Sequence, residues 1–305
     1  MTKYLRNTKI LGNITFPTNI GLGNTKKESY SIPGTYIWSP SNRTDLTNIT
    51  IKLWGGGGGG GRILGRTDQA GGGGGSGGYV TQNLSIDSSQ NLVIIVGEGG
   101  AGAVGSNALG GTASQVFAYN GSTYILKACA GGGGGGGTDP TAGGSGSGGG
   151  GGGAGQDSNT SGSGSLQATY AGIGGLNSTG GNGPNSAIDG EDYAANATTT
   201  GLADLDVATI GGRGGDSEIG SFPTSLVGGG GDGYGGGSSG HGDGGHNGGG
   251  GGGGNFPDFN GSTSILGNSG GQAAVNQAGG TAPNNTDDDY ICLLYTSDAA
   301  DEEDS

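Results

Sequence analysis

Short stretches of alternating apolar and polar residues occur in the first half of the chain, and they predict β-strands. In residues 46–53, Ile49 and Ile51 recur with a period of two, which is typical of a strand with one buried face. Residues 79–86 repeat this pattern more weakly, and the continuous apolar run 92–96 predicts a strand buried on both faces. No segment has the periodicity of an amphipathic helix, so the expected class is all-β.

Turn signals divide the flanking segments. Two strand-like runs, 114–119 and 122–127, flank Asn120-Gly121. Asn-Gly is a strong hairpin signal because a type I′ turn needs positive φ at both central residues. Residues 30–38 predict a strand, a Pro33-Gly34 turn and a second strand.

Glycine accounts for 84 of the 305 residues, and apolar residues for only 29%. Composition therefore favours a flexible chain, since glycine loses the most backbone entropy on ordering. The placement of the glycines favours order, because two blocks directly follow predicted strands and blocks of similar length recur. The sequence therefore does not decide between flexible and ordered glycine blocks. The blocks are 55–61, 71–75, 131–137, 148–153, 228–231 and 248–254.

An ordered form has a physical basis in the extended helix with three residues per turn, which rises about 3.1 Å per residue. A single helix of this kind has no internal hydrogen bonds and is not stable alone. Several packed side by side, with no Cβ to separate them, can satisfy one another's N–H and C=O groups. Such a bundle would replace a side-chain core with a backbone core.

The order of parts over residues 30–137 resembles the glycine-rich domain of phage tail-fibre adhesins and related viral and bacterial surface proteins. The resemblance is carried by segments 32–35, 49–61, 74–80, 92–102, 110–114 and 128–137. It implies an antiparallel β-sandwich merged with a bundle of polyglycine II helices. It also implies host attachment by a virion, through loops between the glycine helices.

The last residues have a different character. Residues 292–302, Cys-Leu-Leu-Tyr-Thr-Ser-Asp-Ala-Ala-Asp-Glu, resemble a translated sequencing adapter. We therefore treat 292–305 as a non-native tail and expect the natural sequence to depart from the printed one after Ile291. The resulting division is an N-terminal segment 1–29, which is a candidate attachment arm, and a domain 30–291. An insertion rich in Ala, Asn, Ser and Thr lies near 156–209.

Charge and composition exclude several classes. The net charge is −14, and −9 without the five acidic residues of the tail. This acidity argues against a nucleic-acid partner, which requires clustered Lys and Arg. No apolar run of about 18 residues is present, so we expect no membrane insertion. We also expect no cofactor, because Gly-x-Gly-x-x-Gly matches here arise from composition alone.

Candidate chemistry is sparse. His241, Asp243 and His246 could bind a divalent metal, but a polar loop tip between glycine helices is the favoured explanation. No triad indicates an enzyme, and Cys129 in a predicted strand is expected to be a small core residue. The candidate receptor-binding residues are the isolated aromatic and basic side chains among the glycines, for which simple packing or a solvated loop is the favoured alternative: Tyr234, Arg62, Arg66, Phe256 and Phe259.

Three functions are consistent with these features. The first is a virion-surface adhesin or structural protein of tail-fibre type, whose partners are a host surface receptor (protein or glycan) and other tail-fibre subunits. The second is a secreted or cell-surface glycine-rich protein, structural or ligand-binding, with an extracellular location. The third is an ice-binding protein, which the irregular loops disfavour.

Overall fold

The computed structural model describes the strands and glycine segments that form the body of the protein. The described residues are 24–40, 48–61, 73–86, 90–102, 108–119, 121–137, 174, 181–182, 229–234, 236–238, 242–243, 246–247, 250–256, 263–265 and 291–297. They contain strands and extended segments without a helix, as the all-β prediction requires. In this part of the chain there is accordingly no helix that could span a membrane.

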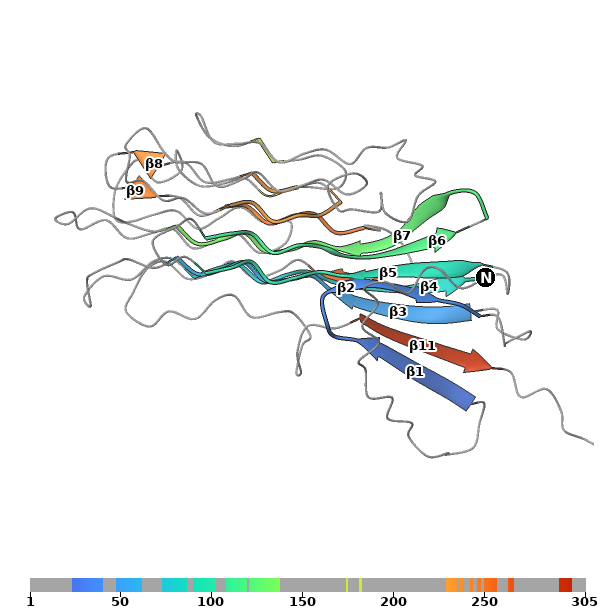
Figure 1. Ribbon diagram of the computed structural model, residues 1–305. Coiled ribbons are helices and arrows are strands. Elements are labelled where there is room, and N and C mark those ends of the chain that lie inside the picture. Colours follow the sequence, from blue (N-terminus) through green and yellow to red (C-terminus); the bar gives the residue numbers. More distant parts are fainter. Residues whose placement is uncertain are drawn as a thin grey trace, which may run out of the picture.

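Two antiparallel sheets pack face to face at one end of the molecule (Figure 1). The five-stranded sheet has the order β1-β11-β3-β4-β10, and the four-stranded sheet the order β2-β5-β6-β7. The bounds in the first sheet are β1 Asn24–Tyr30, β11 Ile291–Ser297, β3 Asn48–Trp54, β4 Tyr79–Ser85 and β10 Thr263–Ile265. In the second they are β2 Gly34–Trp38, β5 Asn91–Val96, β6 Ser114–Tyr119 and β7 Tyr124–Ala130.

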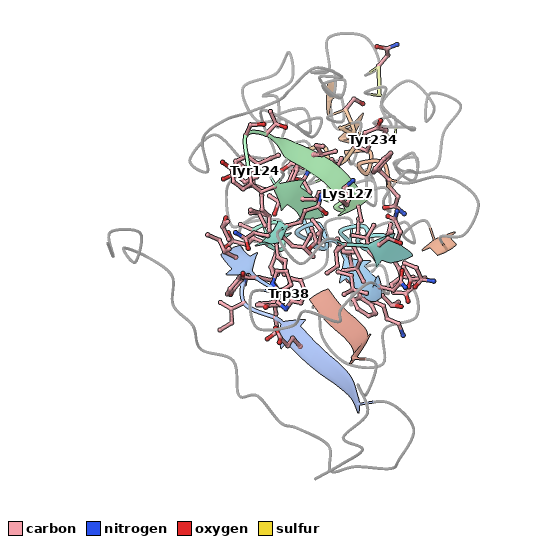
Figure 2. All side chains as sticks on the ribbon, turned by 90° about the vertical axis from the view of Figure 1, so that its right-hand side faces the viewer. Trp38, Tyr124, Lys127 and Tyr234 are labelled. Atoms are coloured by element: carbon pink, nitrogen blue, oxygen red, sulfur yellow. The ribbon has the colours of Figure 1, made fainter. Side chains whose placement is uncertain are left out.

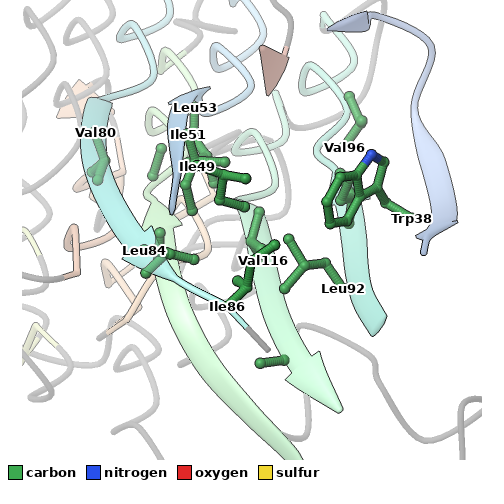
Figure 3. Packing of buried hydrophobic residues seen from close by; sticks show 14 residues of the cluster. Trp38, Ile49, Ile51, Leu53, Val80, Leu84, Ile86, Leu92, Val96 and Val116 are labelled. Carbon is green, nitrogen blue, oxygen red and sulfur yellow. The ribbon is translucent and has the colours of Figure 1, made fainter. Parts of the chain in front are cut away.

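The apolar side chains between the sheets form the side-chain core. The predicted alternation in β3 is confirmed, because Ile49 and Ile51 are buried while Lys52 is only partly covered. β5 is buried along almost its whole length, as its continuous apolar run predicts. Figure 3 shows Ile51 and Val80 of one sheet facing the strands of the other.

The predicted hairpin is also present. β6 and β7 pair antiparallel from Ser114↔Ala130 to Tyr119↔Tyr124, with a bulge between Val116 and Phe117. Gly121 has φ of 95°, a left-handed conformation that glycine adopts without steric cost. β7 continues to Ala130, so Cys129 lies in a strand as expected.

Glycine segments extend from the strand ends away from the sheets (Figure 1). Their backbone hydrogen bonds recur every third residue: Gly55 and Gly58 donate to Gly78 and Gly75, at 3.0 and 2.8 Å. The same spacing holds along the other segments, which matches helices of three residues per turn. The described parts of the glycine blocks therefore form the hydrogen-bonded bundle that their placement after strands favoured, whereas the block 148–153 lies outside the described residues.

Segment 131–137 lies in the middle of this bundle. Its backbone exchanges hydrogen bonds with segments 55–61, 73–78, 108–113, 229–233 and 250–255. A Cβ on Gly131 or Gly134 would overlap a carbonyl of segment 250–255. The close approach of the backbones thus depends on the absence of side chains.

Two strands lie partly outside the predicted domain boundaries. β1 begins at Asn24, within the predicted N-terminal segment, and pairs in register with β11. β11 covers Ile291–Ser297, most of which was assigned to the tail, and it lies between β1 and β3. Cys-Leu-Leu-Tyr-Thr is rich in strand-forming residues, so this segment can occupy a sheet whatever its origin. Of the predicted insertion near 156–209, only residues 174 and 181–182 are described.

Candidate functional site

The end of the glycine bundle that is remote from the sheets is the candidate site, and we call it the distal end. Segment 55–61 leaves β3 and segment 73–78 enters β4, so Gly61 and Gly73 both lie at this end. Segments 97–102 and 108–113 connect β5 and β6 in the same way. The topology therefore directs successive chain connections to one end of a bundle that is fixed by backbone hydrogen bonds.

Two of the predicted receptor-binding residues belong to such a connection. Arg62 directly follows Gly61, and Arg66 lies four residues further along. Both residues are outside the described part of the chain, but the connection that carries them starts at Gly61 and ends at Gly73 at the distal end. A role in receptor binding stays a prediction.

The predicted metal candidates are partly described. The two-residue strands β8 (Gly242–Asp243) and β9 (His246–Asn247) form a small hairpin at the distal end, in which Asp243 pairs with His246 (Figure 1). His241 lies outside the described residues. Among the residues that are described, no three His, Cys, Asp or Glu side chains gather closely enough to hold a metal ion.

Tyr234 and Phe256 lie elsewhere, at the junction between the bundle and the four-stranded sheet. Their rings are 4.5 Å apart, and both pack on the outer face of that sheet against a second apolar cluster that includes Phe117 and Leu126. Figure 2 shows Tyr234 on the side of β7 that faces away from Trp38. Both aromatic residues are only partly buried there, so their role in receptor binding stays a prediction, and Phe259 falls outside the described residues.

The backbone of Phe256 fixes this junction. Its N–H donates to the Cys129 carbonyl at 2.8 Å, and its carbonyl accepts from the Cys129 N–H at 2.7 Å. One residue earlier, the Asn255 side-chain oxygen accepts from the N–H of Gly131 at 2.8 Å. The strand β7 and the last glycine segment are therefore joined at the point where β7 becomes part of the bundle.

Cys129 is completely buried beside this junction. Burial raises the pKa of its thiol to about 12, the hydrogen bond from Gln115 opposes this shift, and the nearby Asp232 carboxylate adds to it. Burial likewise raises the pKa of Tyr234, with a further contribution from Cys129. A thiol that is buried and protonated at neutral pH is a poor nucleophile, which supports its predicted place as a core residue.

The comparison with known families is consistent with this architecture. A model of the glycine-rich domain family matches residues 30–275, more than half of the 305-residue chain. The chain belongs to the glycine-rich domain family. None of the curated proteins matches the sequence. The sequence segments within residues 30–137 predicted a glycine-rich domain, and the family match confirms this prediction.

One exposed residue of the glycine-rich domain was not among the predicted candidates. Leu109 is 49% exposed, and its carbonyl accepts from the N–H of Gly59 near the distal end. In the sequence, Leu109 is marked only as a large apolar residue between Ala108 and Gly110. An exposed apolar residue thus lies beside segment 55–61, two residues before that segment ends at Gly61.

Proposed function

We propose that this glycine-rich domain is a virion-surface adhesin of tail-fibre type, which binds a host surface receptor through the connections at its distal end. The proposed role is binding rather than catalysis, with a protein or a glycan as the receptor. The observation that carries the proposal is the gathering of successive chain connections at the end of the bundle remote from the sheets.

The backbone lattice gives a physical reason for this arrangement. In the central segment, amides bonded to neighbouring segments recur with a period of three residues, as at Gly132 and Gly135 and at Gly133 and Gly136. A connection anchored at both ends by such segments starts from a fixed point. Pre-organisation of this kind lowers the entropy that is lost when a loop binds its receptor.

Binding of the labelled full chain to a panel of bacterial cells and to a glycan array tests the proposal. The informative variant is Arg62→Ala/Arg66→Ala, which removes the basic groups from one distal connection. The matched control is Lys127→Ala, which removes a basic group from β7 in the sheet region. If each arginine contributes about 1 kcal/mol, the double variant weakens binding by roughly tenfold or more, while the control remains near the wild type.

Saturable binding that the arginine variant lowers and the control preserves would support the proposal. Equal binding by the wild type and the arginine variant would remove the distal connection 62–72 from the receptor site. Loss of binding in the Lys127 variant alone would move the site to the sheets and contradict the proposal.

A further inference from the structure

The glycine bundle has two layers that are joined to the sheets in different ways. The segments of the inner layer each run directly into a strand of the two sheets, and they are 55–61, 73–78, 97–102, 108–113 and 131–137. The outer layer consists of segments 229–234, 236–238 and 250–256, which Figure 1 shows in orange beside the green central segment. The outer layer meets the four-stranded sheet at an isolated bridge between Phe256 and Cys129.

The outer layer has hydrogen bonds of its own. The N–H of Gly231 donates to the Gly251 carbonyl at 2.9 Å, and the N–H of Gly251 donates to the Ser238 carbonyl at 2.9 Å. The N–H of Tyr234 donates to the Gly254 carbonyl at 2.8 Å. These bonds join the outer segments to one another, so the outer layer can keep them when it moves as one unit.

The two layers are held together mainly through backbone groups. The N–H groups of Gly132 and Gly135 donate to carbonyls of the outer layer, and their carbonyls accept from its N–H groups. The side-chain oxygen of Asn255 accepts the bond from the N–H of Gly131. When the layers separate, water can take over these bonds, so each bond contributes only modestly to holding the layers together.

Side-chain packing at this interface is confined to the junction with the sheet. The rings of Tyr234 and Phe256 pack, partly buried, on the second apolar cluster, and the fully buried Cys129 belongs to that cluster. The core between the two sheets is a different cluster, which contains Ile51 and Val80. Separation of the layers would therefore uncover Cys129 and leave the core between the sheets intact.

We propose that the outer layer opens as one unit while the inner layer and both sheets stay folded, and that this opening uncovers Cys129 and the second apolar cluster. Proteins open in cooperative units whose free energies range up to that of global unfolding. The inner layer is continuous with five strands, whereas the outer layer is held by the backbone bonds and the junction described above. The outer layer thus acts as a movable strap over the four-stranded sheet.

The reactivity of the Cys129 thiol tests the proposal. The full chain carries Cys292→Ser, which leaves Cys129 as its one thiol, and it is mixed with an aromatic disulfide that releases a coloured thiolate for each thiol modified. Global unfolding is followed in parallel by tryptophan fluorescence in urea. We expect labelling in water to be faster than global unfolding allows. We also expect labelling to depend less steeply on urea, because opening of one layer exposes less surface than global unfolding.

Two glycine variants separate opening of the outer layer from global unfolding. A Cβ on Gly134 would overlap the Gly250 carbonyl of the outer layer, whereas a Cβ on Gly74 would overlap the Gly58 carbonyl within the inner layer. Opening relieves the first overlap and leaves the second. We therefore expect Gly134→Ala to speed labelling by about tenfold or more, and Gly74→Ala to leave it within about twofold of the wild type, although both variants lower the free energy of unfolding.

Asn255→Ala is a second variant at the interface between the layers, and it adds no volume. It removes the acceptor of the Gly131 N–H, which water can replace only in the open state. We expect it to speed labelling by roughly fivefold or more.

Faster labelling in Gly134→Ala and Asn255→Ala but not in Gly74→Ala would support the opening of the outer layer alone. Equal acceleration by Gly134→Ala and Gly74→Ala, with the urea dependence of global unfolding, would overturn the proposal. Labelling of the wild type as fast as the urea-unfolded chain would also overturn it, because the outer layer would then not cover the thiol. Receptor binding does not enter these measurements, so the proposed function can fail or stand independently.

Discussion

Two adjacent glycines make a matched test of the backbone bundle, because they lie on the same segment but face different surroundings. A Cβ on Gly58 would overlap the carbonyl of Gly134 in the central segment. A Cβ on Gly57 would meet only the Gly75 oxygen, at an ordinary distance of 3.5 Å. We therefore compare Gly58→Ala with Gly57→Ala, which change the unfolded chain in nearly the same way.

The expected effects have opposite signs. Replacing glycine by alanine, where the backbone conformation permits, stabilises a protein by about 0.4–1 kcal/mol through the unfolded state. Gly57→Ala should show this gain. At Gly58 the added methyl group overpacks the lattice, at about 1–3 kcal/mol. Separation of the segments also weakens the bonds from Gly58 to Gly75 and from Gly75 to Gly134, at about 1 kcal/mol each.

The two variants should thus differ in unfolding free energy by about 3–5 kcal/mol. For a domain of this size, 1 kcal/mol corresponds to about 2–4 °C in melting temperature, so differential scanning calorimetry should separate the variants by roughly 6–20 °C. Equal melting temperatures for Gly57→Ala and Gly58→Ala would refute the close-packed arrangement of the glycine segments. Destabilisation by Gly57→Ala as large as by Gly58→Ala would refute it as well.

Three further changes test the hairpin, the junction and the buried thiol. Gly121→Ala should lower the unfolding free energy by about 1–2 kcal/mol in urea melts, because alanine is strained at a φ of 95°; no loss would exclude the left-handed turn. Asn255→Ala should cost about 1–3 kcal/mol by the same assay, since it leaves the buried N–H of Gly131 without its acceptor; an unchanged midpoint would contradict that bond. Because the pKa of Cys129 rises from 9.0 to about 12 on folding, the stability from its protonated thiol is complete below pH 9 and is lost as the pH rises towards 12. In Cys129→Ala, the free energy of unfolding should therefore fall less between pH 9 and pH 12 than in the wild type. An equally steep fall in the variant would indicate that the Cys129 thiol is exposed to solvent.

The strands could be predicted from the sequence where local signals and burial agree. Ile49 and Ile51 alternate because only one face of β3 meets the other sheet, and Asn120-Gly121 supplies the conformations that a tight hairpin needs. The place of β11 could not be predicted, because strand pairing over a large sequence separation leaves no local pattern. The adapter-like composition also led us to set that segment apart.

The candidate site was less predictable for a related reason. Tyr234 and Phe256 are isolated among glycines in the sequence, and the sequence does not show that the lattice register brings them, partly buried, onto the second apolar cluster. That register is set by bonds between backbones, such as Tyr234 N–H to Gly254 at 2.8 Å. A polyglycine sequence carries no side-chain pattern from which these pairings could be derived.

Amide hydrogen exchange at individual glycines, followed by NMR on the full chain, tests the bundle most directly. The account predicts slow exchange at amides that donate within the lattice, including Gly58, Gly133 and Gly253. It predicts faster exchange at the exposed Gly60 and Gly99, for which the described residues include no acceptor. Uniformly fast exchange in all glycine segments, beside protected strands β3 and β5, would contradict a backbone-bonded bundle and leave the distal end without a fixed support.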